Sequence, residues 1–283
     1  MPSDSERAPM TRSARGSWLD LDRASFHACI GFAAGVSVFF LVMPTIIVLL
    51  TSFTSSYSLK FPPDGYSLRW YVALLDAVQM QHATWNSLKV AVVATAASIV
   101  LGTSGALALA RSASGWARAL EALFMSPLLL PALAFGFAAL LYFSLIGVGL
   151  SVWTLAAGHV VVCVPFVLRT TIAALLQLDP ALLETSASLG AGRLYTFGRV
   201  TLPLIRRGIG AGAFIAFMAS FDNVPVSLFL SDARTEVLPI HLWQIVETSL
   251  DVRAAAISGV LIVVTLALVA IMERLTGLSR QVR

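Results

Sequence analysis

Six long apolar stretches decide what this chain can fold into. They cover residues 28–52, 87–110, 120–146, 152–168, 208–230 and 254–272. Each is near the twenty residues that an α-helix needs to cross a hydrocarbon core about 30 Å thick. The sequence therefore predicts an all-α integral membrane protein with six transmembrane helices.

Composition argues against the usual soluble classes. Hydrophobic residues make up 58% of the chain and charged residues only 12%, whereas soluble domains carry about 25% charged residues. The two cysteines, Cys29 and Cys163, both lie in apolar stretches, so neither a disulfide framework nor a cysteine metal cluster is predicted. The formal net charge of +4 is weak evidence for a nucleic-acid partner, and none is expected.

The positions of the basic residues predict the orientation. Six spans place both termini on the same side of the membrane. Of the 19 Lys and Arg, 14 fall in the terminal and connecting segments of that side and 5 in the segments of the other. Because Lys and Arg concentrate in cytoplasmic loops, both termini are expected to be cytoplasmic. Residues 1–25 and 276–283 are predicted to be tails around a transmembrane domain of residues 26–275.

The cytoplasmic segment of residues 169–207 carries the most specific pattern. Asp179 is a good helix N-cap, and Pro180 suits the first helical position. Gly190 then supplies a corner that ends the helix, and a second short helix is expected over residues 193–200. Two short helices joined at a glycine corner and tied to a transmembrane helix would form a stiff docking element. An ordinary amphipathic inner loop is the alternative on helix logic alone.

The spacing within this segment resembles the EAA loop of ABC-importer permeases. That family pattern reads Glu-Ala-Ala, then a glycine, then Ile-x-Leu-Pro. Thr185 and Ser186 stand for the two alanines and Val200 for the isoleucine, so these positions stay small or apolar. The resemblance implies a loop that seats in a groove of an ATPase subunit, with the coupling residues Glu184, Thr185, Ser186, Ala187, Gly190, Val200, Leu202 and Pro203.

Other segments between residues 26 and 272 resemble permeases of the spermidine/putrescine type. These segments are 61–71, 86–88, 126–131, 164–169 and 220–225. The resemblance implies a MetI-like fold with the first span peripheral, in the bacterial inner membrane. It also implies an importer built from two homologous permeases, two ABC ATPase subunits and an outer solute-binding protein. ATP would then be used by the ATPase subunits, and this chain would bind no cofactor.

The chain's own chemistry agrees with a non-catalytic subunit. Lys60 and Lys89 both follow Leu, so the GxxxxGK[ST] phosphate loop cannot occur. The four histidines are scattered, and no HExxH pattern predicts a metal site. His159, inside the fourth span, is expected to join helices by hydrogen bonds. A stand-alone secondary transporter would need more buried ionisable groups or inverted repeats, and an intramembrane enzyme would need a nucleophile–base or metal arrangement.

Asp222 is the carboxylate that lies clearly inside a span. It follows Arg207 by 15 residues, which places it about 22 Å along a helix, in the outer half of the membrane. Pro225 removes an intrahelical bond near Asn223. We expect a kinked site on the translocation path formed by Asp222, Asn223 and Pro225, because an intramembrane charge usually faces protein or water. A structural pair or an interfacial carboxylate is the alternative.

A carboxylate at such a site suits a cationic solute such as a polyamine. Permeases of similar sequence carry ferric iron, thiamine or phosphonates, so these solutes stay open as alternatives.

Overall fold

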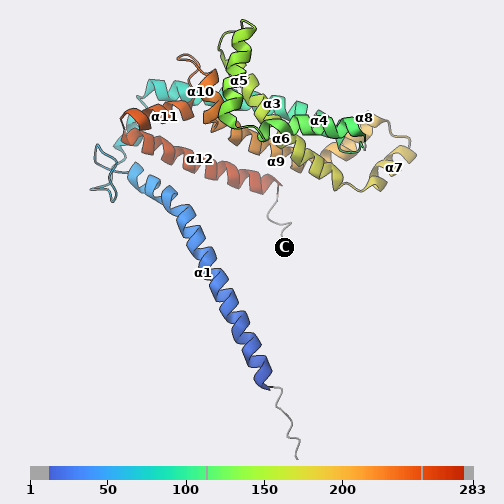
Figure 1. Cartoon of the computed structure of the whole chain (residues 1–283), viewed down its shortest axis with the longest axis horizontal. Coiled ribbons are helices and arrows are strands. Elements are labelled where there is room, and N and C mark those ends of the chain that lie inside the picture. Colours follow the sequence, from blue (N-terminus) through green and yellow to red (C-terminus); the bar gives the residue numbers. More distant parts are fainter. Residues whose placement is uncertain (1–12, 113, 250, 277–283) are drawn as a thin grey trace, which may run out of the picture.

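The computed structural model describes residues 13–112, 114–249 and 251–276, and its long elements in these ranges are all α-helices. Residues 1–12 and 277–283 of the predicted tails lie outside the described residues. Figure 1 shows the helices α1 (Ser13–Ser52), α2 (Arg69–Ala73), α3 (Val78–Leu109), α4 (Gly115–Met125), α5 (Ala132–Leu145), α6 (Val152–Leu176), α7 (Pro180–Ser188), α8 (Arg193–Thr196), α9 (Leu202–Phe221), α10 (Val224–Leu230), α11 (Leu238–Thr248) and α12 (Val252–Thr276).

The core of the bundle is formed by α3, α6 and α9, which lie side by side along the long axis of the molecule (Figure 1). Small residues let these helices approach closely. A Cβ added at Gly102 of α3 would lie 2.8 Å from the Val167 Cβ of α6. Without a hydrophobic driving force between helices in lipid, such close packing is what holds them together.

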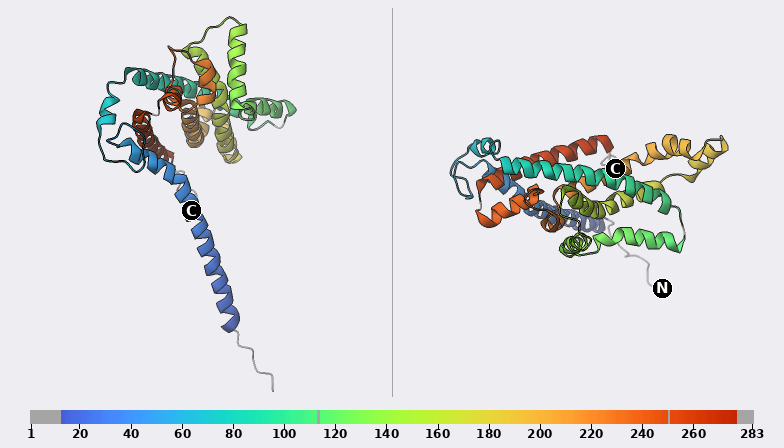
Figure 2. Two further views of the ribbon diagram at one scale, coloured as in Figure 1. Left: turned by 60° about the vertical axis from the view of Figure 1, so that its left-hand side comes forward. Right: turned by 90° about the horizontal axis from the view of Figure 1, so that it is seen from above.

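The described residues contain five helices long and apolar enough to cross a membrane, or six if a bent pair is counted as one span. That pair, Gly115–Leu128 and Ala132–Leu145, is bent by 101°, so the predicted third span over residues 120–146 is not one straight helix. Figure 2 shows α5 standing away from the direction of α4. Pro127 and Pro131 flank the bend, and a proline has no N–H to continue the helical ladder.

The predicted fifth span is also interrupted. A single kinked helix over residues 208–230 was expected, but α9 ends at Phe221 and Asp222 is its C-cap. The Asn223 side chain caps the next helix, α10, by accepting a hydrogen bond of 2.9 Å from the Val226 N–H. Pro225 therefore lies in the first turn of α10, where its missing N–H costs nothing.

Helix α1 leaves the bundle at an angle, and Figure 1 and the left view of Figure 2 show most of its length standing apart from the other helices. It packs against α12, and the Ser52 hydroxyl at its end lies 2.6 Å from the Tyr71 hydroxyl. Large apolar side chains along α1 are exposed, such as Phe32 at 75% and Leu41 at 77%. The first span thus lies outside the helical core, as the resemblance implied.

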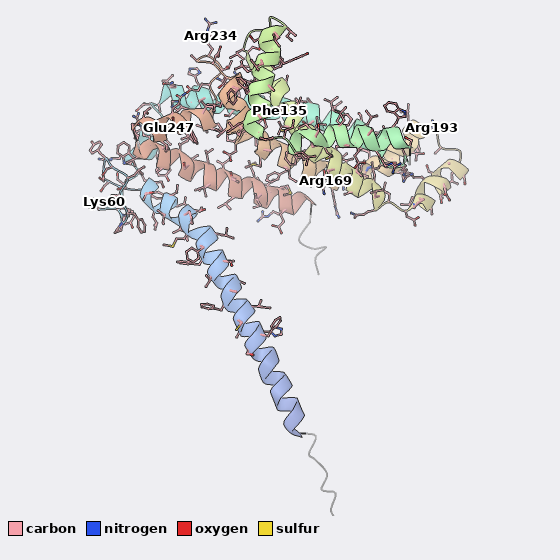
Figure 3. All side chains as sticks on the ribbon, viewed as in Figure 1. Lys60, Phe135, Arg169, Arg193, Arg234 and Glu247 are labelled. Carbon is pink, nitrogen blue, oxygen red and sulfur yellow. The ribbon has the colours of Figure 1, made fainter. Side chains whose placement is uncertain are left out.

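The connecting segments divide between two ends of the bundle. Residues 53–77 and α11 lie at one end, and α7 and α8 lie at the other (Figure 1). Figure 3 labels Lys60 and Glu247 at the first end and Arg193 at the opposite end. The core helices therefore separate residues 53–77 and α11 from α7 and α8, which belong to the predicted cytoplasmic segment 169–207.

Candidate functional site

The element at the α7–α8 end begins with a well-formed helix cap. The Asp179 side chain accepts a hydrogen bond of 2.9 Å from the Ala181 N–H. Pro180 is the first helical residue, where its missing N–H is not needed. The predicted start of this helix is confirmed at both positions.

Gly190 forms the corner between α7 and α8. Its φ is +80°, a left-handed conformation that glycine adopts without the clash that a Cβ would cause. The Gly190 N–H donates to the Ala187 carbonyl at 2.9 Å, and the Ala191 N–H donates to the Ser186 carbonyl at 3.1 Å. This pair of bonds is the Schellman motif that ends a helix. The glycine corner that the sequence predicted is confirmed.

A side-chain hydrogen bond closes this corner. The Ser186 hydroxyl lies 2.8 Å from the Thr196 hydroxyl, and Ser186 is buried although its neighbours on α7 are exposed. The bond joins α7 directly to α8. The serine that departs from the family pattern thus takes part in holding the element rigid, and the spacing of residues gave no signal for its partner.

The second part of the element is continuous with a core helix. Helix α8 passes through a π-helical stretch, Phe197–Thr201, into α9, so that one helical segment of 29 residues extends from Arg193 to Phe221. The predicted loop of residues 169–207 is shorter than expected, because α6 continues to Leu176 and the helix resumes at Arg193. Any movement of the corner would therefore be carried directly into the core of the bundle.

The predicted coupling residues are only partly brought together. A groove of about 770 Å³ between α7 and α8 is lined by Thr185, Ser186, Gly190 and Val200. Glu184 and Ala187 lie on α7 outside this groove, and Ala187 lines a second cavity toward α3 and α6. The last two residues of the family pattern, Leu202 and Pro203, are in the first turn of α9.

Large apolar side chains surround the corner, and the sequence reasoning did not single them out. Leu189 is 83% exposed, Leu194 is 88% exposed and Tyr195 is 63% exposed. Exposed apolar residues that gather on one element mark a surface for a protein or a membrane. The sequence signal that could have identified them is the position of these apolar residues next to Gly190 and Gly192 in a predicted cytoplasmic loop.

The predicted translocation residues separate into two groups. Asp222 lines a cavity of about 320 Å³ between α9, α11 and α12, and the other lining residues are uncharged: Met218, Phe221, Leu238, Pro239, Leu242, Leu261, Ile262, Thr265 and Leu266. Asn223 and Pro225 do not line this cavity, because they begin α10. Among the described residues, no group of three His, Cys, Asp or Glu side chains could hold a metal ion.

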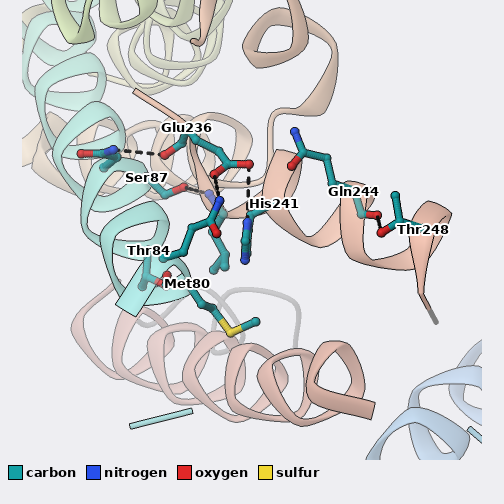
Figure 4. A network of polar contacts seen from close by, with 10 residues as sticks. Met80, Thr84, Ser87, Glu236, His241, Gln244 and Thr248 are labelled. Atoms are coloured by element: carbon teal, nitrogen blue, oxygen red, sulfur yellow. Dashed lines mark hydrogen bonds and ion pairs between the residues drawn. The ribbon is translucent and has the colours of Figure 1, made fainter. Parts of the chain in front are cut away.

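A polar network holds α11, which covers this cavity, against α3 (Figure 4). The Gln79 amide donates to the Glu236 carboxylate at 3.2 Å, and the His241 Nδ1 lies 3.4 Å from the other oxygen of that carboxylate. The Ser87 hydroxyl accepts a hydrogen bond of 2.8 Å from the Leu238 N–H at the start of α11. The network holds the wall of the cavity that α11 contributes, and it joins residues about 150 positions apart in the sequence.

A bundle of membrane-length helices, with a glycine corner at one end and a cavity that contains Asp222 toward the other, fits a membrane transport component. The chain belongs to the family of inner membrane components of binding-protein-dependent transport systems, whose model matches residues 98–277. It is therefore the permease component of such an importer, and the expectations of this family and of a non-catalytic transmembrane subunit are confirmed.

Curated relatives agree with this assignment. The chain is 29% identical over 238 residues to the spermidine/putrescine transport system permease protein PotC of Haemophilus influenzae, covering 84% of this chain and 92% of that protein. It is 29% identical over 235 residues to the putrescine transport system permease protein PotI of Escherichia coli strain K12, covering 79% of this chain and 82% of that protein.

Solved structures share the fold. A chain of a bacterial ABC transporter involved in the import of the acidic polysaccharide alginate superposes with a TM-score of 0.72 at 16% identity, covering 92% of this chain and 98% of that one. A chain of the MetNI methionine ABC transporter, in an inward-facing conformation, gives a TM-score of 0.59 at 17% identity over 71% of this chain and 96% of that one. The all-helical MetI-like fold is thereby confirmed.

Proposed function

We propose that this permease imports a polyamine in a cycle driven by ATP hydrolysis on separate ABC ATPase subunits, to which it docks through α7, Gly190 and α8. One observation carries the proposal: a single helical segment, Arg193–Phe221, joins this docking element to Asp222 at the cavity. The same piece of structure therefore contacts the energy source at one end and the solute path at the other.

The chemistry of the docking element suits a protein partner. Glu184 is exposed on α7, and within the described residues it makes no ion pair. Leu189 and Leu194 are almost fully exposed beside the corner, and burying such a side chain contributes about 1.5–3 kcal/mol. An ATPase groove that covers both leucines and offers a cation to Glu184 would satisfy all three residues.

The rigidity of the element supports a lever mechanism. The Ser186–Thr196 bond joins α7 to α8, and the Schellman motif fixes the backbone at the corner between them. When two ATPase subunits close on ATP, the docked corners of this chain and of its partner permease would be drawn together. The α8–α9 segment would then swing and open the path outward toward the solute-binding protein, and ATP hydrolysis would reset it.

The cavity supports a polyamine as the solute. A polyamine carries ammonium groups separated by methylene chains, and the cavity offers one carboxylate, Asp222, among apolar residues that include Phe221 and Met218. The relatives PotC and PotI are named for spermidine and putrescine. Ferric iron, thiamine and phosphonate are the alternative solutes, and a direct comparison of uptake distinguishes them.

We also propose six membrane spans with both termini in the cytoplasm. The bent pair α4–α5 would then count as one broken span, and 14 of the 19 basic residues would lie on the cytoplasmic side. A membrane-impermeant thiol reagent added outside the cell is expected to label Ser58→Cys and to leave Ser188→Cys unlabelled. The opposite pattern would contradict this orientation.

The docking role of Glu184 has a sharp test. In the reconstituted importer, Glu184→Lys is expected to weaken ATPase binding and abolish uptake while the permease still inserts and stays folded. The matched control is Glu273→Lys, which makes the same charge change at an exposed position on α12. Unchanged assembly and uptake in Glu184→Lys, or an equal loss in the control, would contradict the proposal.

A further inference from the structure

The imidazole of His159 joins the two sides of the break between α9 and α10. His159 lies on α6 and is 1% exposed. Its Nδ1 is 2.8 Å from the Ser220 hydroxyl in the last turn of α9, and its Nε2 is 3.1 Å from the Ser227 hydroxyl in α10. The prediction that His159 joins helices by hydrogen bonds is confirmed, and its two partners lie on either side of Asp222.

Few backbone bonds hold this break in shape. Asp222 caps the end of α9, and the Asn223 N–H makes only a long bond of 3.4 Å to the Ser220 carbonyl. The next helix starts afresh, because its Val226 N–H is satisfied by the Asn223 side chain. The relative position of α9 and α10 therefore depends on side-chain contacts. His159 contributes one hydrogen bond to each helix, through Ser220 of α9 and Ser227 of α10.

On one side of the break, α6 and α9 are closely packed. Small residues recur every fourth position of α9 and face α6: Gly208, Gly212, Ala216 and Ser220. A Cβ at Gly212 would lie 2.8 Å from the Val167 Cα, and the Cys163 thiol donates to the Ala216 carbonyl at 3.3 Å. Helices α6 and α9 thus form one body that includes His159.

On the other side of the break, α10 packs against α5. A Cβ at Gly136 would lie 2.7 Å from the Pro225 carbonyl oxygen, and the rings of Phe137 and Phe229 meet edge to face with centroids 5.7 Å apart. Helices α5 and α10 thus form a second pair, and the backbone joins α10 to α9 only through the residues of the break. Helix α10 also packs on α6, where a Cβ at Gly158 would meet Leu230 and lie 3.1 Å from the Val226 Cγ1. Figure 1 shows α10 next to α5, away from the α8 end of α9.

We propose that His159 is a positioning residue that makes α10 and α5 follow the movement of α6 and α9, and so holds Asp222 in place during transport. Since the neutral imidazole donates through one nitrogen and accepts through the other, it can satisfy one serine as acceptor and the other as donor. His159 is buried and does not line the cavity that contains Asp222. It acts through the two helices that it joins.

The proposal rests on the importer cycle described above, and it predicts a loss of coupling rather than a loss of ATP hydrolysis. When His159 is replaced by Leu, α6 and α9 still follow the ATPase. Helix α10 then loses its hydrogen bond through Ser227 and keeps only the apolar packing of Val226 and Leu230 on α6. Stimulation of the ATPase by the solute-loaded binding protein should persist. The amount of solute taken up for each ATP hydrolysed should fall by at least about fivefold, the population change that one net hydrogen bond supports.

The experiment measures uptake and ATP hydrolysis together in proteoliposomes that contain the complete importer, with labelled putrescine as the probe. The variants are His159→Leu and Ser227→Ala, which removes a single hydroxyl. The matched control is Cys163→Ala, which removes a hydrogen bond one turn along the same α6–α9 seam without touching the break. Both test variants should show the lowered ratio of solute to ATP, and the control should keep the wild-type ratio.

Three results would overturn the proposal. The first is an assembled His159→Leu importer with the wild-type ratio. The second is a wild-type ratio in Ser227→Ala, which also decides the matter if His159→Leu fails to assemble. The third is an equal loss in Cys163→Ala, which would assign the effect to packing. Failure of the underlying importer cycle looks different, because the wild-type complex would then lack stimulated ATP hydrolysis and ATP-dependent uptake.

Discussion

Replacing Gly190 by Ala tests the corner of the docking element most sharply. Gly190 has φ +80° and no atoms within 4 Å of an added Cβ, so the substitution introduces backbone strain without a steric clash with neighbours. That strain is about 1–2 kcal/mol for a residue with a Cβ in the left-handed region. In the free permease the corner can relax and release this strain, whereas in the complex with the ATPase it is held in the left-handed conformation. The strain is then subtracted from the binding free energy, so the affinity for the ATPase falls by about 5- to 30-fold, because 1.4 kcal/mol corresponds to a tenfold change.

The assay measures binding of the purified ATPase to the permease in nanodiscs as a function of ATPase concentration. Gly192→Ala is the matched control, because Gly192 lies in the same corner with φ −68° and ψ 159°, which alanine adopts without strain. Gly190→Asn should fall between wild type and Gly190→Ala, since Asn tolerates the left-handed region. Equal affinities for Gly190→Ala and Gly192→Ala would refute the reasoning.

Two further predictions concern the core and the cavity. Gly212→Ala should destabilise the folded permease by about 1–3 kcal/mol through overpacking against Val167, and so lower its melting temperature. The control Gly35→Ala on α1 places a Cβ with no atoms within 4 Å and should leave the melting temperature unchanged. Equal melting temperatures for the two variants would contradict the close packing of α6 and α9. Asp222→Asn should lower putrescine uptake at least tenfold and leave ATPase binding unchanged, and unaltered uptake would remove Asp222 from the path.

The docking element was largely predictable because its signals are local. Asp179, Pro180 and Gly190 act on the backbone within a few residues of themselves, so their chemistry can be interpreted from the sequence. The hydrogen bond from Ser186 to Thr196 was not predictable, because it depends on how the corner folds back. The same holds for the exposure of Leu194, which reflects where the element stands on the bundle.

The two breaks in the spans were missed for a physical reason. Hydropathy measures the transfer of side chains into lipid and contains no information on backbone direction. Because the stretch around Pro127 and Pro131 is as apolar as an unbroken helix, hydropathy does not indicate the 101° bend. At the second break, Pro225 was interpreted as a kink. The side chain of Asn223 instead starts a new helix, in which Pro225 is well placed.

The two partners of His159 carry no signal in the sequence. Its two serines lie 61 and 68 residues further along the chain, on helices whose facing sides depend on the packing of the whole bundle. The small residues of α9 at every fourth position do indicate a packed face. They do not indicate which helix occupies it.

The most direct test of the importer is uptake of labelled spermidine or putrescine by the reconstituted complex, with thiamine and ferric iron as competitors. The predicted result is saturable polyamine uptake that requires ATP and is lost in Glu184→Lys and reduced in Gly190→Ala. Uptake of another solute with the same dependence on the docking element would keep the importer and reject the polyamine. Uptake by this chain alone, without ATPase subunits, would contradict the permease-subunit function itself.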